Sequence, residues 1–195
     1  MPRAGLSADV VTATAADLVD ELARSGAGAE ALTLAAVADR LGVKIPSLYK
    51  HVAGLPALQR GLMLRAKLSL GDAMRSAAVG RSGDDAVAAV AHAYRGWAAE
   101  HPGQYSFTWA AGDPADEANL EASERVLTLI VAMLGAYDLS GDDALDAIRF
   151  FRATLHGFVS LETGGGYGMP LDIDRSFERL VAATVAALRA WGRTA

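Results

Sequence analysis

Apolar residues recur along most of the chain every three or four positions, which is the period of an amphipathic α-helix. One such stripe near the N-terminus consists of Val10, Val11, Thr14, Leu18 and Leu22. No sustained alternation of apolar and polar residues, the pattern of a half-buried strand, interrupts these helical segments. The pattern therefore predicts an all-α fold of about nine helices.

Residues that start and stop helices divide this pattern into segments. Ser7 and Thr33 suit helix N-caps, Gly42 suits a helix end, and Ser140 with Asp143 suggests a capping pair. A His-Pro-Gly sequence at 101–103 should interrupt the helical run before a short aromatic segment at 105–109. The longer helices are expected at 7–24, 34–41, 46–52, 55–78, 82–100, 114–136, 140–163 and 174–191.

Residues 33–52 predict two short helices joined by a tight turn at Gly42. A pair of this size can place its second helix in a B-DNA major groove, which is about 12 Å wide. That helix would expose donors and flat rings suited to phosphates and base edges, with no acid among them: Lys44, Ser47, Tyr49, Lys50 and His51. The apolar positions are expected to be core: Leu34, Val37, Leu41, Val43, Leu48 and Val52. The stretch therefore predicts a helix-turn-helix that binds DNA.

The segment Leu41-Gly42-Val43-x-x-Pro46-Ser47-Leu48-Tyr49-x-His51-Val52 resembles the turn and recognition helix of the TetR family of bacterial repressors. The resemblance implies a three-helix DNA-binding domain at 1–54. It also implies a helical-bundle domain for ligand binding and dimerisation at 55–195, whose helix at 55–78 connects the two. The implied function is a transcriptional regulator, a repressor that a small molecule releases from a palindromic double-stranded DNA operator. The DNA-binding residues would be Thr33, Lys44, Ile45, Pro46, Ser47, Tyr49, Lys50 and His51.

The chain departs from the family pattern directly after this motif. The family usually has a lysine at the start of the fourth helix, where it binds a phosphate, and this chain has Leu55-Pro56. Arg60 could replace that contact, and Arg3 could act as an N-terminal arm on DNA. The departure leaves a second interpretation open, a helical small-molecule-binding protein or enzyme whose helix-turn-helix no longer binds DNA. A purely structural helical adaptor would bind neither.

The net charge of −5 by itself argues against a nucleic-acid partner, but the charges are unevenly distributed along the chain. Residues 1–78 contain nine basic and seven acidic side chains, and the remainder contains nine basic and sixteen acidic ones. The N-terminal part is therefore mildly basic, at +2, and the rest is acidic, at −7. This distribution is compatible with DNA binding by the N-terminal part.

A regulator of this type is expected to be a homodimer, because a two-fold dimer matches a palindromic site. The last two long helices are the predicted interface, since a partner's copies could cover their apolar stripes in a four-helix arrangement. The stripes consist of Leu145, Ile148, Leu155, Val159, Phe177, Leu180, Val181, Val185 and Leu188. The alternative is that these residues form the core of a single chain.

Aromatic residues and methionines gather in the middle of the chain, where the family resemblance implies a ligand. Small-molecule pockets are mostly apolar with a few polar groups, and no cluster of acids faces inward in the pattern, so a small apolar or neutral ligand is expected. The predicted pocket residues are Tyr94, Trp97, Tyr105, Trp109, Met133, Phe151 and His156. Each of them could instead fill a helical core.

Several chemistries find no support in the sequence. The absence of cysteine excludes disulfides, thiolate metal sites and cysteine nucleophiles. The histidines have no zinc-ligand spacing, and Gly164-Gly165-Gly166 lacks the Lys and Ser/Thr of a phosphate loop. We therefore expect no metal, no cofactor and no catalytic residue. With no visible signal peptide and no apolar run of the roughly 20 residues that a span needs, we expect a cytoplasmic protein without a membrane partner.

Overall fold

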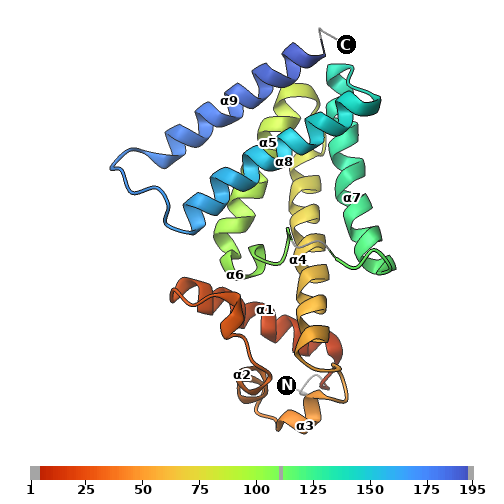
Figure 1. Ribbon diagram of the computed structural model, residues 1–195, viewed down its shortest axis with the longest axis vertical. Coiled ribbons are helices and arrows are strands. Elements are labelled where there is room, and N and C mark those ends of the chain that lie inside the picture. Colours follow the sequence, from red (N-terminus) through yellow and green to blue (C-terminus); the bar gives the residue numbers. More distant parts are fainter. Residues whose placement is uncertain (1–4, 110–111, 193–195) are drawn as a thin grey trace. The chain divides into compact units, whose positions relative to one another are not determined.

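The computed structural model describes residues 5–109 and 112–192 of the 195-residue chain. Arg3, considered above as a DNA-contacting arm, lies outside the described residues. All regular structure in the described part is helical, which confirms the predicted all-α class with nine α-helices (Figure 1). They are α1 (Ala8–Arg24), α2 (Leu34–Leu41), α3 (Ile45–Leu48), α4 (Leu55–Ala78), α5 (Gly83–Glu100), α6 (Pro102–Tyr105), α7 (Glu117–Leu134), α8 (Gly141–Thr163) and α9 (Ile173–Trp191), with 3-10 turns η1 (Ala29–Ala31) and η2 (Gly135–Tyr137).

Local signals set several helix ends where the sequence predicts them. The Ser7 hydroxyl accepts a hydrogen bond from the Val10 amide at 3.2 Å, and the Thr33 hydroxyl accepts one from the Ala36 amide at 3.1 Å. Gly42 ends α2 with a φ of +66°, a left-handed conformation that glycine adopts without strain. The predicted capping pair of α8 is wrong in one respect, because Ser140 occupies the N-cap position but its side chain makes no capping hydrogen bond.

Three segments differ from the expected helices. The predicted helix at 46–52 ends as an α-helix at Leu48 and continues in turns, with the His51 and Val52 amides donating to the Leu48 carbonyl. α7 begins at Glu117 rather than at 114, because the Asp113 carboxylate accepts the Ala115 amide and closes a turn first. The expected interruption after Glu100 lasts for one residue, and α6 then forms with Pro102 in its first turn.

Packing divides the chain into two compact units. The first consists of Met1–Ser69 with His101–Asn119, and the second consists of Leu70–Glu100 with Leu120–Ala195. α4 is one uninterrupted helix that crosses from the first unit into the second. The predicted boundary after residue 54 separates a DNA-binding domain from a ligand-binding domain by function and not by packing. It therefore stays a prediction.

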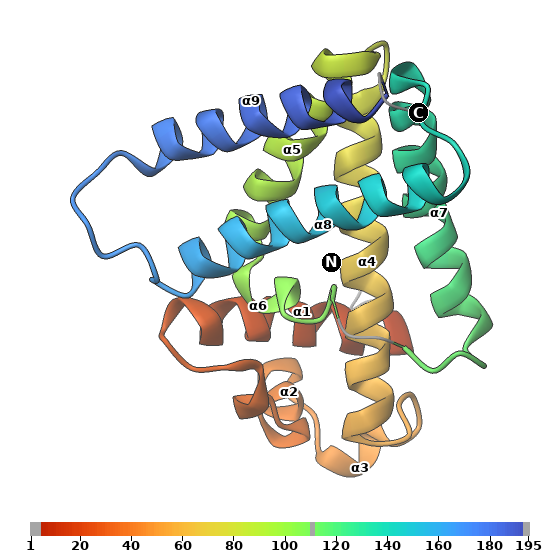
Figure 2. The same ribbon diagram turned by 45° about the horizontal axis from the view of Figure 1, so that its top comes forward.

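The first unit is built on a core shared by α1, α2, α3 and the beginning of α4. α6, although distant in sequence, packs against α1 in the same unit (Figure 2). The fully buried side chains of this core include Val11, Val19, Leu32, Val37, Leu48, Leu58 and Leu62. The core therefore fixes the helix-turn-helix to α1 and α4.

In the second unit α5 packs against both α8 and α9, which lie side by side (Figures 1 and 2). This packing corrects part of the predicted interface, because five of the nine stripe residues are buried inside the chain: Leu155, Val159, Phe177, Val181 and Leu188. Periodicity alone cannot separate a core stripe from an interface stripe, because both are apolar and both recur at helical spacing. Leu145 remains exposed, and Ile148, Leu180 and Val185 are half-buried.

In the described residues no helix combines the length and apolar character needed to cross a membrane.

Candidate DNA-binding site

The α2–turn–α3 segment is fixed by backbone hydrogen bonds and by one buried leucine. At the turn, the Gly42 amide donates to the Asp39 carbonyl at 3.1 Å and the Val43 amide donates to the Ala38 carbonyl at 3.0 Å. Leu48 of α3 is fully buried in the core of the first unit. Because α3 has only four residues, its orientation depends on this tertiary contact rather than on helix propensity.

The predicted DNA-binding residues all lie on this scaffold, and none of them is fully buried. Thr33 caps α2, Lys44 occupies the N-cap position of α3, and Pro46 lies in the first turn of α3. Tyr49 is 59% exposed although it follows the buried Leu48 directly. Ile45, Pro46 and Lys50 are also exposed, and Ser47 and His51 are half-buried. The segment thus presents these side chains together to solvent, and their contact with DNA stays a prediction.

An ion pair attaches α2 to α1 next to this segment. The Arg40 guanidinium donates to both oxygens of Glu21, with Nη1–Oε1 at 3.0 Å. The hydrogen bond from Arg40 lowers the pKa of the Glu21 carboxyl, and both groups are exposed. Arg40 therefore already has a carboxylate partner within the first unit and is a poor candidate for a phosphate contact.

Arg60, the residue considered above as a substitute for the missing lysine, also has a partner inside the first unit. Its Nε and Nη2 donate to the two oxygens of Asp116, each at 2.6 Å. This bidentate hydrogen bond lowers the pKa of the Asp116 carboxyl. A phosphate could bind Arg60 only in competition with a carboxylate of favourable geometry.

A buried carboxylate that the sequence did not reveal joins α1 to α6. Asp20 is 4% exposed, and its Oδ1 accepts the backbone amides of Gly103 and Gln104, each at 2.9 Å. Its Oδ2 accepts Gln104 Nε2 at 2.7 Å and lies 3.2 Å from His101 Nδ1. The close approach requires Gly103, because a Cβ there would lie 2.0 Å from the Val19 carbonyl oxygen. The sequence indicates only that α6 begins at Pro102-Gly103. The first amides of a helix need hydrogen-bond acceptors from outside the helix, but the sequence does not identify Asp20 as that acceptor.

The predicted pocket residues divide between the two units. Tyr94, Trp97, Met133 and Phe151 are buried in the second unit, where His156 is half-buried on α8. Tyr105 is buried in the first unit, and Trp109, in the same unit, is 52% exposed. A packed core and a closed ligand pocket would both bury these side chains, so the pocket stays a prediction.

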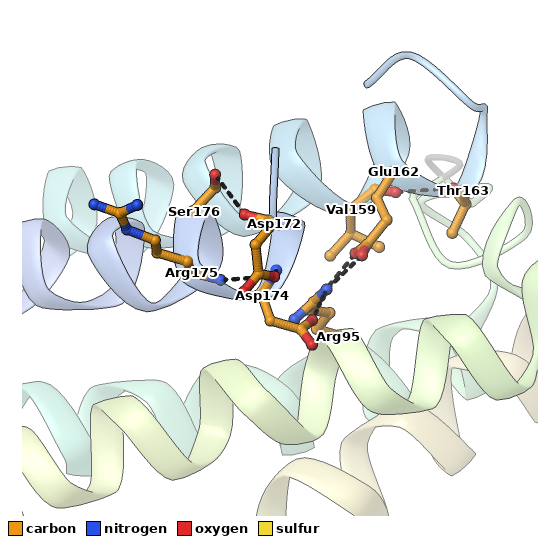
Figure 3. Close-up of polar contacts among 8 residues, drawn as sticks. All are labelled: Arg95, Val159, Glu162, Thr163, Asp172, Asp174, Arg175 and Ser176. Atoms are coloured by element: carbon orange, nitrogen blue, oxygen red, sulfur yellow. Dashed lines mark hydrogen bonds and ion pairs between the residues drawn. The ribbon is translucent and has the colours of Figure 1, made fainter. Parts of the chain in front are cut away.

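An ion-pair cluster fastens α9 and α8 to α5 in the second unit (Figure 3). Arg95 of α5 donates to both Glu162 oxygens, at 2.8 and 2.5 Å, and to Asp174 Oδ1 at 2.7 Å. The Arg95 guanidinium also lies over the Phe177 ring, 4.8 Å from its centroid. The hydrogen bond to Glu162 is the main reason that the pKa of Arg95 is raised above its usual value. The cluster therefore joins the last turn of α8 and the first turn of α9 to α5.

The other end of α9 is fastened to α5 as well. Arg189 Nε donates to Asp84 at 3.1 Å, and the Tyr137 hydroxyl donates to the same carboxylate at 2.8 Å. Burial raises the pKa of the Tyr137 hydroxyl, and Asp84 raises it further. Among the described residues no group of three or more histidines and acids is arranged to bind a metal ion.

Comparison with known proteins agrees with this architecture. Residues 87–184 match the family described as "Tetracyclin repressor-like, C-terminal domain". The HTH-type transcriptional regulator Rv0681 of Mycobacterium tuberculosis is 36% identical over 162 residues, which cover 83% of this chain and 74% of that protein.

Solved structures share the fold at lower identity. One, described as a possible TetR family transcriptional regulator from Streptomyces coelicolor A3(2), has a TM-score of 0.72 at 21% identity and covers 94% of this chain and 99% of its own. The Streptomyces coelicolor TetR family protein ActR, crystallised in complex with (S)-DNPA, has a TM-score of 0.64 at 18% identity and covers 96% of this chain and 98% of its own.

The chain therefore belongs to the TetR family of transcriptional regulators. Its helix-turn-helix is the DNA-binding element of that class, and the matched family domain lies C-terminal to it.

Proposed function

We propose that this protein is a cytoplasmic, homodimeric repressor that binds a palindromic operator and releases it when a small apolar or neutral ligand binds. The DNA-contacting residues of each copy are Thr33, Lys44, Ile45, Pro46, Ser47, Tyr49, Lys50 and His51. The observation that carries the proposal is the change from buried to exposed side chains at 48–50. The buried Leu48 anchors α3, and the next two side chains, Tyr49 and Lys50, are exposed. Family membership supports a function in transcription, and the complex of ActR with (S)-DNPA supports a ligand-binding role for this fold.

α4 supplies the route by which a ligand could act. The helix begins shortly after α3 and runs without a break into the second unit, so a tilt of α4 would move α3 with it. A ligand shifts such an equilibrium only through its different affinities for the two states. The same operator should therefore bind the free dimer more tightly than the ligand-bound dimer.

Fluorescence anisotropy with the DNA upstream of the protein's own coding sequence tests the DNA-binding part of the proposal. We expect binding that weakens as salt rises, and a loss of at least tenfold in affinity for Tyr49→Ala and for Lys50→Ala. Arg125→Ala on α7 removes an exposed charge outside the helix-turn-helix and serves as the matched control. Absence of DNA affinity at low salt would contradict the proposal.

One observation favours the second interpretation, a ligand-binding helical protein that no longer binds DNA. Leu55-Pro56 replaces the usual phosphate-binding lysine, and Asp116 already engages the nearby Arg60. An Asp116→Asn variant tests whether Arg60 replaces the missing lysine. If Arg60 contacts DNA, weakening its carboxylate partner should tighten operator binding, and unchanged operator binding would exclude Arg60 from the interface. Absence of DNA affinity in both proteins at low salt would favour the second interpretation.

A further inference from the structure

Ile45 is an apolar side chain on the recognition segment that lies outside the core of the first unit. Within residues 33–52, all of which the structure describes, most large apolar side chains are buried or half-buried, and Val43, two positions before Ile45, packs against the core. The exceptions are Ile45, which is 38% exposed, and Tyr49, which is 59% exposed. Core packing therefore does not account for a branched aliphatic residue at position 45.

The exposed side chains of this segment share one side of it. Ile45 is the first residue of α3, and Tyr49 follows four positions later, directly after the end of the helix. Side chains four positions apart lie on the same side of a helical segment, one turn from each other. Leu48 between them is fully buried, whereas Lys44 and Lys50 are exposed. The exposed side of the segment therefore combines apolar carbon with two cations.

The backbone at the start of α3 leaves few hydrogen-bond donors beside Ile45. Pro46 has no amide hydrogen, and the Ser47 amide already donates to the Lys44 carbonyl at 2.8 Å. Pro46 is also exposed, so its ring adds carbon to that of the Ile45 side chain. Apart from the Lys44 side chain, this end of α3 therefore presents mainly hydrocarbon, which makes no hydrogen bond with a base edge.

The base edges in the major groove of B-DNA include one apolar group, the 5-methyl group of thymine. The other groups there are hydrogen-bond donors and acceptors, and a side chain without polar atoms would remove water from them without compensation. Residues 41–52 contain no acid, and the exposed Lys44 and Lys50 suit phosphates beside the groove. The apolar surface at Ile45 therefore matches a thymine better than a G·C pair.

We propose that Ile45 contacts the 5-methyl group of one thymine in each operator half-site and thereby selects an A·T pair at that position. The inference rests on the proposed DNA binding and adds the base that the first residue of α3 recognises. Loss of one buried methyl contact should weaken binding about fourfold. Loss of the same contact in both half-sites of a palindrome should weaken it about fifteenfold.

Deoxyuridine tests the contact, because it lacks only the 5-methyl group of thymine and keeps the base pairing. An operator is selected from random-sequence DNA, each symmetric pair of thymines is replaced in turn, and fluorescence anisotropy measures the dissociation constant. We expect the wild type to lose about fifteenfold in affinity at one such pair. Ile45→Ala should bind the thymine and deoxyuridine operators equally at that pair.

A second substitution in the DNA returns the methyl group without the thymine. At the same position a G·C pair should weaken wild-type binding, and 5-methylcytosine in place of cytosine should restore part of the affinity, because it carries a methyl group at the same place in the groove. Ile45→Ala should not distinguish cytosine from 5-methylcytosine. Because Ile45 lies outside the core, this variant should keep the circular dichroism spectrum of the wild type.

Leu68→Ala is the matched control, because Leu68 is 37% exposed and lies on α4, outside the helix-turn-helix. It should distinguish thymine from deoxyuridine as the wild type does, and Ile45→Val, which keeps a branched side chain, should retain part of the difference. A deoxyuridine penalty that persists unchanged in Ile45→Ala, or no penalty at any thymine in the wild type, would overturn the inference while DNA binding stands. Absence of DNA affinity at low salt would instead overturn the proposed function on which the inference rests.

Discussion

Asp20 links two segments that lie 83 positions apart in sequence, since its Oδ1 accepts the amide of Gly103. A carboxylate at a helix N-terminus satisfies amides that have no partner within the helix, and here it does so for a helix on a different part of the chain. Because α6 has only four residues, it depends on this acceptor for its position. The carboxylate therefore fixes α6 to α1 within the first unit.

We expect Asp20→Ala to lower the free energy of unfolding by about 3 kcal/mol, because two buried backbone amides and the Gln104 amide group lose their acceptor. Urea denaturation followed by circular dichroism measures the change. Asp17→Ala, three positions earlier on an exposed site of α1, is the matched control and should cost less than about 0.5 kcal/mol. Equal effects of the two variants would show that Asp20 is not an essential acceptor.

His156 gives the stability a dependence on pH. Partial burial lowers the pKa of its imidazole, and nearby Arg152 lowers it further. A lowered pKa means that the unfolded state binds the proton more readily, so this contribution is fully present above pH 6.5, the ordinary value, and is lost as the pH falls through the folded-state pKa. His156→Gln should therefore lose less stability than wild type between neutral pH and pH 5, as thermal unfolding over a pH series would measure. Parallel curves for the two proteins would contradict this role.

At the scale of elements, two adjacent residues of the helix-turn-helix have different roles. Leu48 is buried and stabilises the fold, and Tyr49 is exposed and is proposed to contact DNA. Leu48→Ala should cost about 3 kcal/mol of unfolding free energy, because it leaves a cavity in a fully packed core. Tyr49→Ala should cost less than about 1 kcal/mol, because the ring is 59% exposed, and should still weaken operator binding at least tenfold. Chemical denaturation and anisotropy on the same two variants test the pair. A Tyr49 variant that binds DNA like wild type would remove that ring from the interface.

How far the sequence predicts these elements depends on how local the determining interactions are. The ends of α1 and α2 are predictable because Ser7, Thr33 and Gly42 act on residues within one turn of themselves. α6 is not predictable, because its acceptor lies on α1, far away in sequence. Helix periodicity likewise identifies Leu155 and Phe177 as apolar-stripe residues, but only the packing against α5 shows that they are core.

At the scale of the whole molecule, the charge is divided between a basic part that carries the helix-turn-helix and an acidic part that does not. The net charge of −5 conceals a value of +2 for residues 1–78 and −7 for the rest. The acidic part would be repelled by phosphates, which should favour orientations in which the helix-turn-helix reaches DNA first. Within the first unit, Arg40 and Arg60 have carboxylate partners, which leaves Lys44 and Lys50 as the main candidates for phosphate contacts on the recognition segment.

Because few basic side chains are available to bind phosphates, the salt dependence of operator binding can be used to count the phosphate contacts. Each neutralised phosphate contributes about −0.9 to the slope of log affinity against log salt concentration. If each copy of a dimer contacts one phosphate through Lys50, Lys50→Ala should reduce the magnitude of the slope by about 1.8, whereas a single bound copy would give about 0.9. Anisotropy titrations at several salt concentrations measure the slope, and Arg125→Ala makes the same charge change on α7 as a control. A change near 1.8 for Lys50, with none for Arg125, is expected if two copies act on one operator. An unchanged slope would place Lys50 away from the phosphate backbone.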